Sequence, residues 1–194
     1  MELQKAINNR HSIRAFENKI VSKSILKKLI LNASKAPSAK NEQPWNFYVA
    51  YTKTKRDIIA GYYYKRLEEF SNETKKMPKK FRTAIAHIKE NMGGCPHVIF
   101  AFIEKRQKAP IYQFQNDIAG ISCAIENLML SAVESGLGTC WIGTLKDDES
   151  NIKKLMNIPS NQELIATIFI GYPKKGYKPL IRKKRKLSEI LKFV

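Results

Sequence analysis

Two arginines and a serine stand close together near the N-terminus, in the run Arg10-His11-Ser12-Ile13-Arg14. A guanidinium group forms paired hydrogen bonds with a phosphate or a carboxylate, and a serine hydroxyl adds a neutral donor. The run therefore indicates a small anion-binding site. Because basic runs are frequent in a chain with 35 Lys and Arg, a solvated surface segment is the alternative.

A second candidate is the segment from Pro37 to Trp45, which places Ser38, Asn41 and Gln43 between two prolines. Hydroxyl and amide groups in a rigid loop can bind the hydrogen-bonding edge of a flat heterocycle. The alternative is a tight turn in which these side chains cap the local backbone. Both interpretations place the loop directly before a strand.

A glycine-rich segment, Gly136 to Gly143, is the third candidate. Glycine lets the backbone come close to a ligand or to a second chain. The glycine spacing is not the dinucleotide-binding fingerprint, and the segment follows a helix rather than a strand. A helix end and a buried strand would explain Gly136 but leave Gly143 without a role.

Signatures of catalysis by the protein's own side chains are missing. The sequence contains no GxSxG elbow and no GxxxxGK[ST] phosphate loop. Its three cysteines and three histidines show neither a CxxC pair nor zinc-ligand spacing, so we expect no metal site and no disulfide framework. If the chain is an enzyme, a cofactor supplies the reactive group.

The charge balance is strongly basic, with a formal net charge of +18. The run Lys183-Lys184-Arg185 belongs to a C-terminal stretch that is especially rich in lysine. Such a balance suggests a nucleic-acid or anionic-membrane partner, and a lysine-rich solvated surface is the favoured alternative. The chain has no apolar stretch of ~20 residues and no apolar leader segment, so we expect a cytoplasmic protein.

Hydrophobic periodicity then gives the elements that must position these segments. Helices are predicted over residues 2–9, 22–34, 117–135 and near 148–156, with Ser22 as an N-cap and Gly136 just past a helix end. The charged stretch 55–91 is predicted to be helical and divided at Pro78. Strands are predicted over residues 45–52, 97–103, 140–144 and 163–170. Together they indicate one domain over residues 1–194, a mixed sheet packed with helices.

The predicted helix 117–135 is apolar on nearly all sides. A helix of this kind is either buried centrally or packed against a second subunit.

The order of these segments carries a family resemblance. RHSIRAF, APSAKNEQPW, ENLMLSAVESGLGTCWIG, ELIATIFIGYP and the basic RKKRKLSEI follow one another over nearly the whole chain. In this order they resemble the nitroreductase family of FMN-dependent oxidoreductases. The resemblance implies an α+β fold with a mixed, mainly antiparallel central sheet, in an intertwined homodimer with FMN at the subunit interface. Residues 55–95 carry no motif of that family.

The resemblance also implies roles for individual residues. Arg10 and Ser12, with His11 beside them, would hold the FMN phosphate and ribityl chain, and Arg14 would lie near the pyrimidine end of the flavin. A reduced flavin carries negative charge there, so a fixed cation favours reduction. The remaining implied FMN contacts come from the loop of the other subunit, from the strand after the glycines and from the C-terminal basic run: Pro37, Ser38, Asn41, Gln43, Trp141, Ile142, Gly143, Lys183 and Arg185.

The function implied is ping-pong transfer of a hydride from NAD(P)H, through FMN, to a nitroaromatic, a quinone or a similar electrophile. The protein places the reactants and stabilises charge, and no residue acts as a nucleophile. A dehalogenating or flavin-remodelling enzyme is the alternative within the family. A basic nucleic-acid-binding module is the alternative outside it, and the sequence offers it neither an aromatic platform nor a recognition helix.

Overall fold

The central sheet has four strands in the order β1-β2-β4-β3, and the neighbouring strands all pair antiparallel. The computed structural model describes residues 2–69, 75–89, 91–106, 110–180 and 183–194. In this part of the chain the predicted mixed sheet is antiparallel in its named strands, and Ser12 adds an isolated parallel bridge to Thr139. The strands are β1 (Trp45–Ala50), β2 (His97–Glu104), β3 (Gly138–Ile142) and β4 (Gln162–Gly171).

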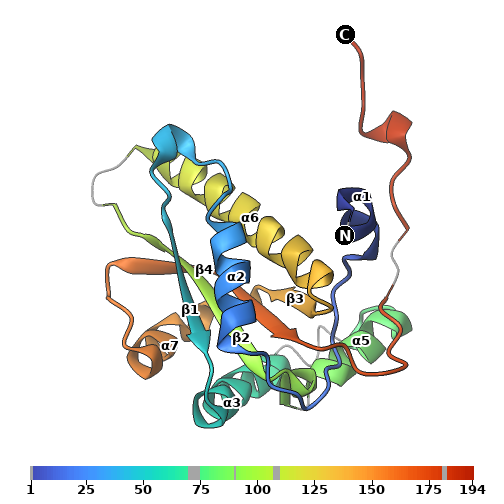
Figure 1. The fold of residues 1–194 in the computed structure, drawn as a ribbon. Coiled ribbons are helices and arrows are strands. Elements are labelled where there is room, and N and C mark those ends of the chain that lie inside the picture. Colours follow the sequence, from blue (N-terminus) through green and yellow to red (C-terminus); the bar gives the residue numbers. More distant parts are fainter. Residues whose placement is uncertain (1, 70–74, 90, 107–109, 181–182) are drawn as a thin grey trace.

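Helices cover both faces of the sheet (Figure 1). One face packs against α2 and α6, and the other against α3 and α7. The helices are α1 (Leu3–Asn9), α2 (Lys23–Ala33), α3 (Lys53–Glu69), α5 (Lys79–Lys89), α6 (Ile111–Glu134) and α7 (Glu149–Met156). Short 3-10 turns lie at η1 (Ala39–Asn41), η2 (Asn91–Gly94), η3 (Thr144–Asp148) and η4 (Leu187–Glu189).

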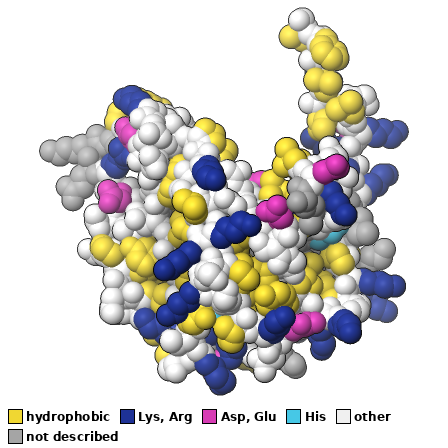
Figure 2. All heavy atoms as spheres, in the orientation of Figure 1, with side chains coloured by type: hydrophobic (Ala, Val, Ile, Leu, Met, Phe, Trp, Pro, Cys, Tyr) yellow, Lys and Arg dark blue, Asp and Glu magenta, His cyan; other side chains and the backbone are white. Residues whose placement is uncertain are grey.

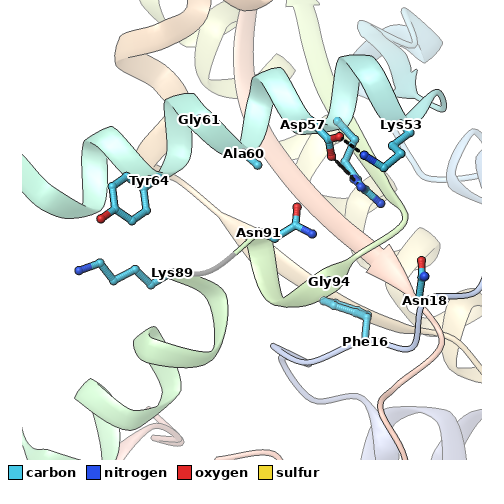
Figure 3. A pocket seen from close by; sticks show the side chains of 11 residues that line it. Phe16, Asn18, Lys53, Asp57, Ala60, Gly61, Tyr64, Lys89, Asn91 and Gly94 are labelled. Carbon is cyan, nitrogen blue, oxygen red and sulfur yellow. Dashed lines mark hydrogen bonds and ion pairs between the residues drawn. The ribbon is translucent and has the colours of Figure 1, made fainter.

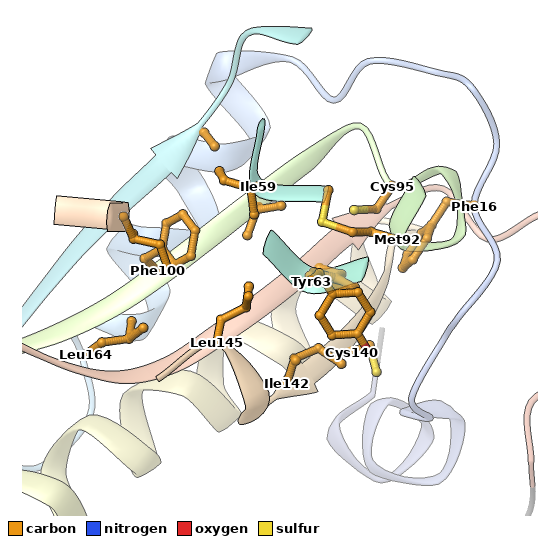
Figure 4. Packing of buried hydrophobic residues seen from close by; sticks show 14 of the residues in the cluster. Phe16, Ile59, Tyr63, Met92, Cys95, Phe100, Cys140, Ile142, Leu145 and Leu164 are labelled. Carbon is orange, nitrogen blue, oxygen red and sulfur yellow. The ribbon is translucent and has the colours of Figure 1, made fainter. Parts of the chain in front are cut away.

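Each sheet face has its own hydrophobic core because alternate residues of a strand point to opposite faces. On β2, Ile99 faces the core shared with α2 and α6, whereas Phe100 faces the core shared with α3. Figure 4 shows the second core, in which Tyr63 of α3 lies near Cys140 and Ile142 of β3. Tyr63 also meets Phe169 of β4 edge-on, with 5.2 Å between ring centroids. The continuous burial of β2 from His97 to Ile103 confirms the prediction of a central strand covered on both sides.

Local signals at helix ends are confirmed. The Ser22 side chain accepts a hydrogen bond from the Ile25 N–H and caps α2. Gly136 follows α6 with φ of 72°, the left-handed conformation that suits glycine just past a helix end. The Leu137 N–H then donates to the carbonyl of Ala132 and closes the helix.

Several predicted boundaries were wrong. Helix α6 begins at Ile111 rather than at 117. Its first turns carry the apolar side chains Ile111, Tyr112 and Phe114, which are exposed and so are not part of the buried face that the prediction followed. Strand β1 ends at Ala50 because Thr52 caps α3, through an N–H bond from Lys55 to its hydroxyl. Strand β3 spans 138–142 rather than 140–144 because the chain winds into η3 from Thr144.

The C-terminal segment leaves the body of the molecule and runs beyond α1 (Figure 1). It carries five exposed apolar side chains: Leu187, Ile190, Leu191, Phe193 and Val194. Among the described residues, no helix has the length and apolar character needed to cross a bilayer.

Candidate functional site

The N-terminal motif lies directly against strand β3. The Ile13 N–H donates to the Thr139 carbonyl at 2.9 Å, next to the Ser12–Thr139 bridge. A Cβ on Gly138 would lie 2.5 Å from Ile13 Cγ1, so only glycine allows this approach. Two motifs far apart in the sequence therefore form one structural unit, and Gly138 has a role that neither motif showed by itself.

The two arginines of the motif are held in different ways. Arg10 Nε lies 3.3 Å from Glu126 Oε1 of α6, and Arg10 stays partly exposed. Arg14 is half-buried, and its Nη1 donates to the Ser12 carbonyl at 3.3 Å. His11 and Ser12 are also half-buried. The motif thus presents one accessible cation and one fixed cation on either side of a serine.

The charge of Arg14 reaches buried groups behind β3. Burial raises the pKa of the Cys140 thiol, while Arg14 and a hydrogen bond from Ser12 act in the opposite direction. Burial also raises the pKa of Tyr63, against a smaller lowering by Arg14. These side chains therefore lie within electrostatic reach of one another, which places the centre of α3 close to the site.

Strand β3 is buried except at Trp141, and the exposed Gly143 follows its end. Trp141 is 39% exposed, whereas the Ile142 side chain belongs to the core on the α3 side. Gly143 is exposed, and a Cβ there would meet no atom within 4 Å. Any ligand contact by Ile142 must therefore use its backbone, while Trp141 and Gly143 offer an accessible side chain and an open backbone.

The loop from Pro37 to Gln43 is tightly folded on itself. The Ser38 hydroxyl accepts from the Gln43 N–H at 3.0 Å, and the Asn41 Oδ1 accepts from the Gln43 side-chain amide at 3.3 Å. Lys40, Asn41 and Gln43 all have positive φ, of 52°, 55° and 47°. This left-handed backbone conformation costs free energy for residues other than glycine, and residues that adopt it cluster at functional sites. The loop is thus the predicted tight turn, in which side chains cap the local backbone. It is also strained and exposes polar groups.

Helix α6 separates this loop from the N-terminal motif. Gly120 packs against Pro37 and Ser38, whereas Glu126 pairs with Arg10. These two positions differ by roughly 9 Å along the helix axis and about 120° around it. Within one chain the loop and the motif therefore occupy different sides of α6.

The C-terminal basic residues lie on the segment that leaves the body. Lys183 and Arg185 are exposed, and the Arg185 guanidinium donates to the Glu189 carbonyl at 2.6 Å. A nearby carboxylate, Glu189 Oε2, lies 3.5 Å from Arg185 Nε. The guanidinium is therefore bound within its own segment in this conformation of the chain.

Sequence reasoning missed two groups beside the site. Glu126 contacts Arg10, and a lone carboxylate on a helix gave no signal for that contact. Tyr63 lies in the stretch without a recognisable motif, and only its position in the helical pattern of α3 could have placed it in the core.

Known proteins with related sequences and structures agree with this architecture. The Nitroreductase family model matches residues 7–172. A protein of Archaeoglobus fulgidus named "Putative NADH dehydrogenase/NAD(P)H nitroreductase" is 29% identical over 89% of this chain and 86% of its own length. The iodotyrosine deiodinase of Hydra vulgaris is 26% identical over 96% of this chain and 70% of its own.

The crystal structure of a BluB-like flavoprotein from Clostridium difficile 630 superposes with a TM-score of 0.78. The two sequences are 26% identical, and the match covers 100% of this chain and 99% of the other. The family match spans both the N-terminal motif and the strand that it lies against. By sequence, fold and the pairing of these two motifs, the chain belongs to the nitroreductase family of flavoprotein enzymes.

Proposed function

We propose that this protein is an FMN-dependent oxidoreductase that takes a hydride from NAD(P)H and delivers it to a nitroaromatic, a quinone or a similar electrophile. The observation that carries the proposal is the packing of the Arg10–Arg14 motif against β3 through Gly138. It gathers two cations, a hydroxyl and an accessible strand end in one place. The family relationship supports the same chemistry.

The residues present fit a phosphorylated flavin. Arg10 and Ser12 would hold the phosphate, since an accessible guanidinium and a hydroxyl suit a group with about −1.5 to −2 charge near neutral pH. By the family resemblance Arg14 would lie near the pyrimidine end, and its half-buried position suits a fixed cation there. Trp141 and Gly143 would border the ring system. FMN, once bound, supplies the two-electron redox chemistry that no side chain here can provide.

The chain itself contributes binding, orientation and charge. Arg14 stabilises negative charge at its end of the site, and the open backbone at Gly143 leaves room for a planar group. Glu126 competes with a phosphate for Arg10, so anion binding must displace that ion pair or share the guanidinium. Chemistry of this kind needs no nucleophile and no general base from the protein.

We further propose that the site is completed in an intertwined homodimer. The Pro37–Gln43 loop would reach the flavin of the partner chain, because it lies on a different side of α6 from the motif within its own chain. The Lys183/Arg185 pair would close on the phosphate. The accessible face of α6, which includes Ala119 and Cys123, and the apolar C-terminal segment would form the subunit contact. Leaving five apolar side chains of one extended segment in water is unfavourable, which supports a partner for that segment.

The net charge of +18 does not by itself call for a nucleic acid. On the face shown in Figure 2, Lys and Arg side chains are scattered among hydrophobic and acidic ones rather than gathered in a stripe. A stripe is the expected electrostatic footprint of a nucleic-acid-binding surface. We therefore assign the arginines of the motif to a small anion.

The decisive experiment measures flavin directly. The purified protein should be yellow and release about one FMN per chain on denaturation, and anaerobic NADH or NADPH should bleach it. A panel of a nitroaromatic, a quinone and a halogenated tyrosine then compares reductase with dehalogenase activity. Colourless protein that does not take up added FMN would refute the proposal, as would flavin that neither nicotinamide reduces.

A further inference from the structure

A cavity of about 740 Å³ opens between α3, η2 and the segment that follows the N-terminal motif (Figure 3). None of the residues proposed to hold FMN lines it. Its walls come from three separate parts of the chain: Phe16 and Asn18; Lys53, Arg56, Asp57, Ala60, Gly61 and Tyr64; Lys89, Asn91 and Gly94. The proposed flavin chemistry therefore leaves this cavity unexplained.

One end of the cavity has an excess of positive charge. The Nε and Nη2 atoms of Arg56 donate to Asp57 Oδ1 at 3.0 and 2.6 Å, and Lys53 Nζ donates to Asp57 Oδ2 at 2.6 Å. Two cations thus share a single carboxylate. Arg56 is only 7% exposed, so its charge is weakly screened by water. This end therefore favours an additional anion.

The rest of the wall offers neutral hydrogen-bonding and flat surfaces. The side chains of Asn18 and Asn91 border the cavity opposite α3, and the small residues Ala60 and Gly61 form its floor on the helix (Figure 3). Tyr64 closes the far end, one turn beyond Ala60. The cavity thus has a charged end and a flatter, less polar end.

The sequence of α3 is unfavourable for a helix at the positions that line the cavity. Its first turn contains Lys53 and Arg56 and no acidic residue, although cations are unfavourable at a helix N-terminus. Gly61 lies in the interior of α3, where glycine weakens a helix relative to alanine. A Cβ on Gly61 would meet no atom within 4 Å, so packing does not require glycine there. A ligand in the cavity would account for both features, because the cations would bind it and the glycine would leave room for it.

We propose that this cavity binds a small organic anion, with a carboxylate or phosphate group at Arg56 and Lys53 and a flat ring over Ala60 and Gly61. The volume lies within the range of small-molecule sites. The charged end orients the ligand, and the missing side chain at Gly61 makes room for its ring. This site is additional to the flavin site and shares no lining residue with it.

Calorimetric titration of protein loaded with one FMN per chain and freed of excess FMN tests the proposal, because the flavin site is then filled and its occupancy is followed by absorbance, while no free FMN competes for the cavity. Phenyl phosphate and benzoate should bind, and the neutral benzyl alcohol should not. Lys53→Met and Arg56→Gln should each weaken phenyl phosphate binding by about tenfold or more. Lys55→Met is the matched control, since it removes the same charge from the same turn but Lys55 does not line the cavity.

A second variant tests the ring end without touching the charges. Gly61→Leu should raise the thermal midpoint of unfolding, weaken phenyl phosphate binding and leave the binding of inorganic phosphate unchanged. If Arg56→Gln does not fold, Lys53→Met and Gly61→Leu decide the matter. The proposal is overturned if neither anion binds, if benzyl alcohol binds as well as benzoate, or if Lys55→Met weakens binding as much as Lys53→Met.

Discussion

The N-terminal motif and the Pro37–Gln43 loop are both candidate cofactor contacts in the sequence, yet the two segments are held in the structure in different ways. The motif is fixed to β3 by the backbone hydrogen bond from Ile13 to Thr139 and by the close contact of Ile13 with Gly138. The loop is exposed, lies on another side of α6 and uses its polar groups on one another. The C-terminal segment, with Lys183 and Arg185, is more exposed still.

This contrast divides the proposed flavin site into two parts. The anchored half is the N-terminal motif with β3, and the exposed half is the Pro37–Gln43 loop with the C-terminal basic pair. The anchored half is held by contacts within one chain, the Ile13–Thr139 hydrogen bond and the packing of Ile13 against Gly138. In the proposed homodimer the Pro37–Gln43 loop contributes to the flavin site of the other chain. The predictions below separate the two halves.

Removing residues 187–194 should have the largest effect, because the deleted segment contains five exposed apolar side chains. Burying a Leu, Ile or Phe side chain contributes about 1.5–3 kcal/mol, so loss of only two such contacts weakens the proposed dimer by a hundredfold or more. Sedimentation velocity of the truncated and full-length proteins measures the change. Lys192→Ala is the control, and an unaltered dimer after truncation would contradict the role given to this segment.

Arg10→Ala should lower FMN affinity by tenfold to a hundredfold, because a hydrogen bond to a charged group contributes about 1.5–3 kcal/mol. Fluorescence titration with FMN measures this. Glu126→Gln is the informative partner variant, since it frees Arg10 from its ion pair and should keep or increase FMN affinity. Binding to DNA should depend steeply on salt and change little in Arg10→Ala, because one charge is a small part of a diffuse field.

An Arg10→Ala variant with full FMN affinity and reductase activity, but without salt-resistant, sequence-selective DNA binding, would show that the motif serves a nucleic acid.

Gly138→Ala should destabilise the anchored half by about 1–3 kcal/mol, the usual cost of forcing an extra methyl group into a packed site. The added Cβ would lie 2.5 Å from Ile13 Cγ1, whereas at Gly143 it would meet nothing within 4 Å. Thermal denaturation of Gly138→Ala and Gly143→Ala therefore compares the same change in filled and open space. Equal midpoints for the two variants would mean that Ile13 is not packed as described.

Cysteine labelling should give the subtlest difference. Cys123 is exposed on α6, whereas Cys95 and Cys140 are buried, and burial raises the pKa of both thiols. At pH 8 the two buried thiols stay neutral and enclosed, so iodoacetamide should modify Cys123 alone, as read by mass spectrometry. Labelling of Cys123 should slow as protein concentration rises through the dimerisation range. If the labelling rate of Cys123 does not depend on protein concentration, the exposed face of α6 is not part of the subunit contact.

The sequence was sufficient for most of the fold because periodicity and capping are local. Ser22 and Gly136 mark their helix ends, and the apolar run of β2 marks a central strand. It was insufficient where exposed residues continue an element, as in the first turns of α6. The prediction followed the apolar face that α6 buries, and the first turns of the helix expose their apolar side chains instead.

For the site, the sequence identified the motifs but not their partners. The contact of Ile13 with Gly138 and the ion pair of Arg10 with Glu126 depend on tertiary packing between distant segments. The left-handed residues at Lys40, Asn41 and Gln43 were equally invisible, since none is glycine. Most of the residues that line the cavity on α3 lie in the stretch without a motif, and the signal in the sequence was a glycine and cations at unfavourable helix positions.

The bond between Ile13 and Thr139 also has a consequence for biosynthesis. The N-terminal motif cannot reach its final position until β3 has left the ribosome. At 5–20 residues per second, β3 emerges roughly 6–25 s after the motif. During that time Ile13 has no strand to pack against. Flavin-binding capacity should therefore appear late in translation, and a nascent chain stalled before Gly138 should fail to retain FMN even with its arginine motif complete.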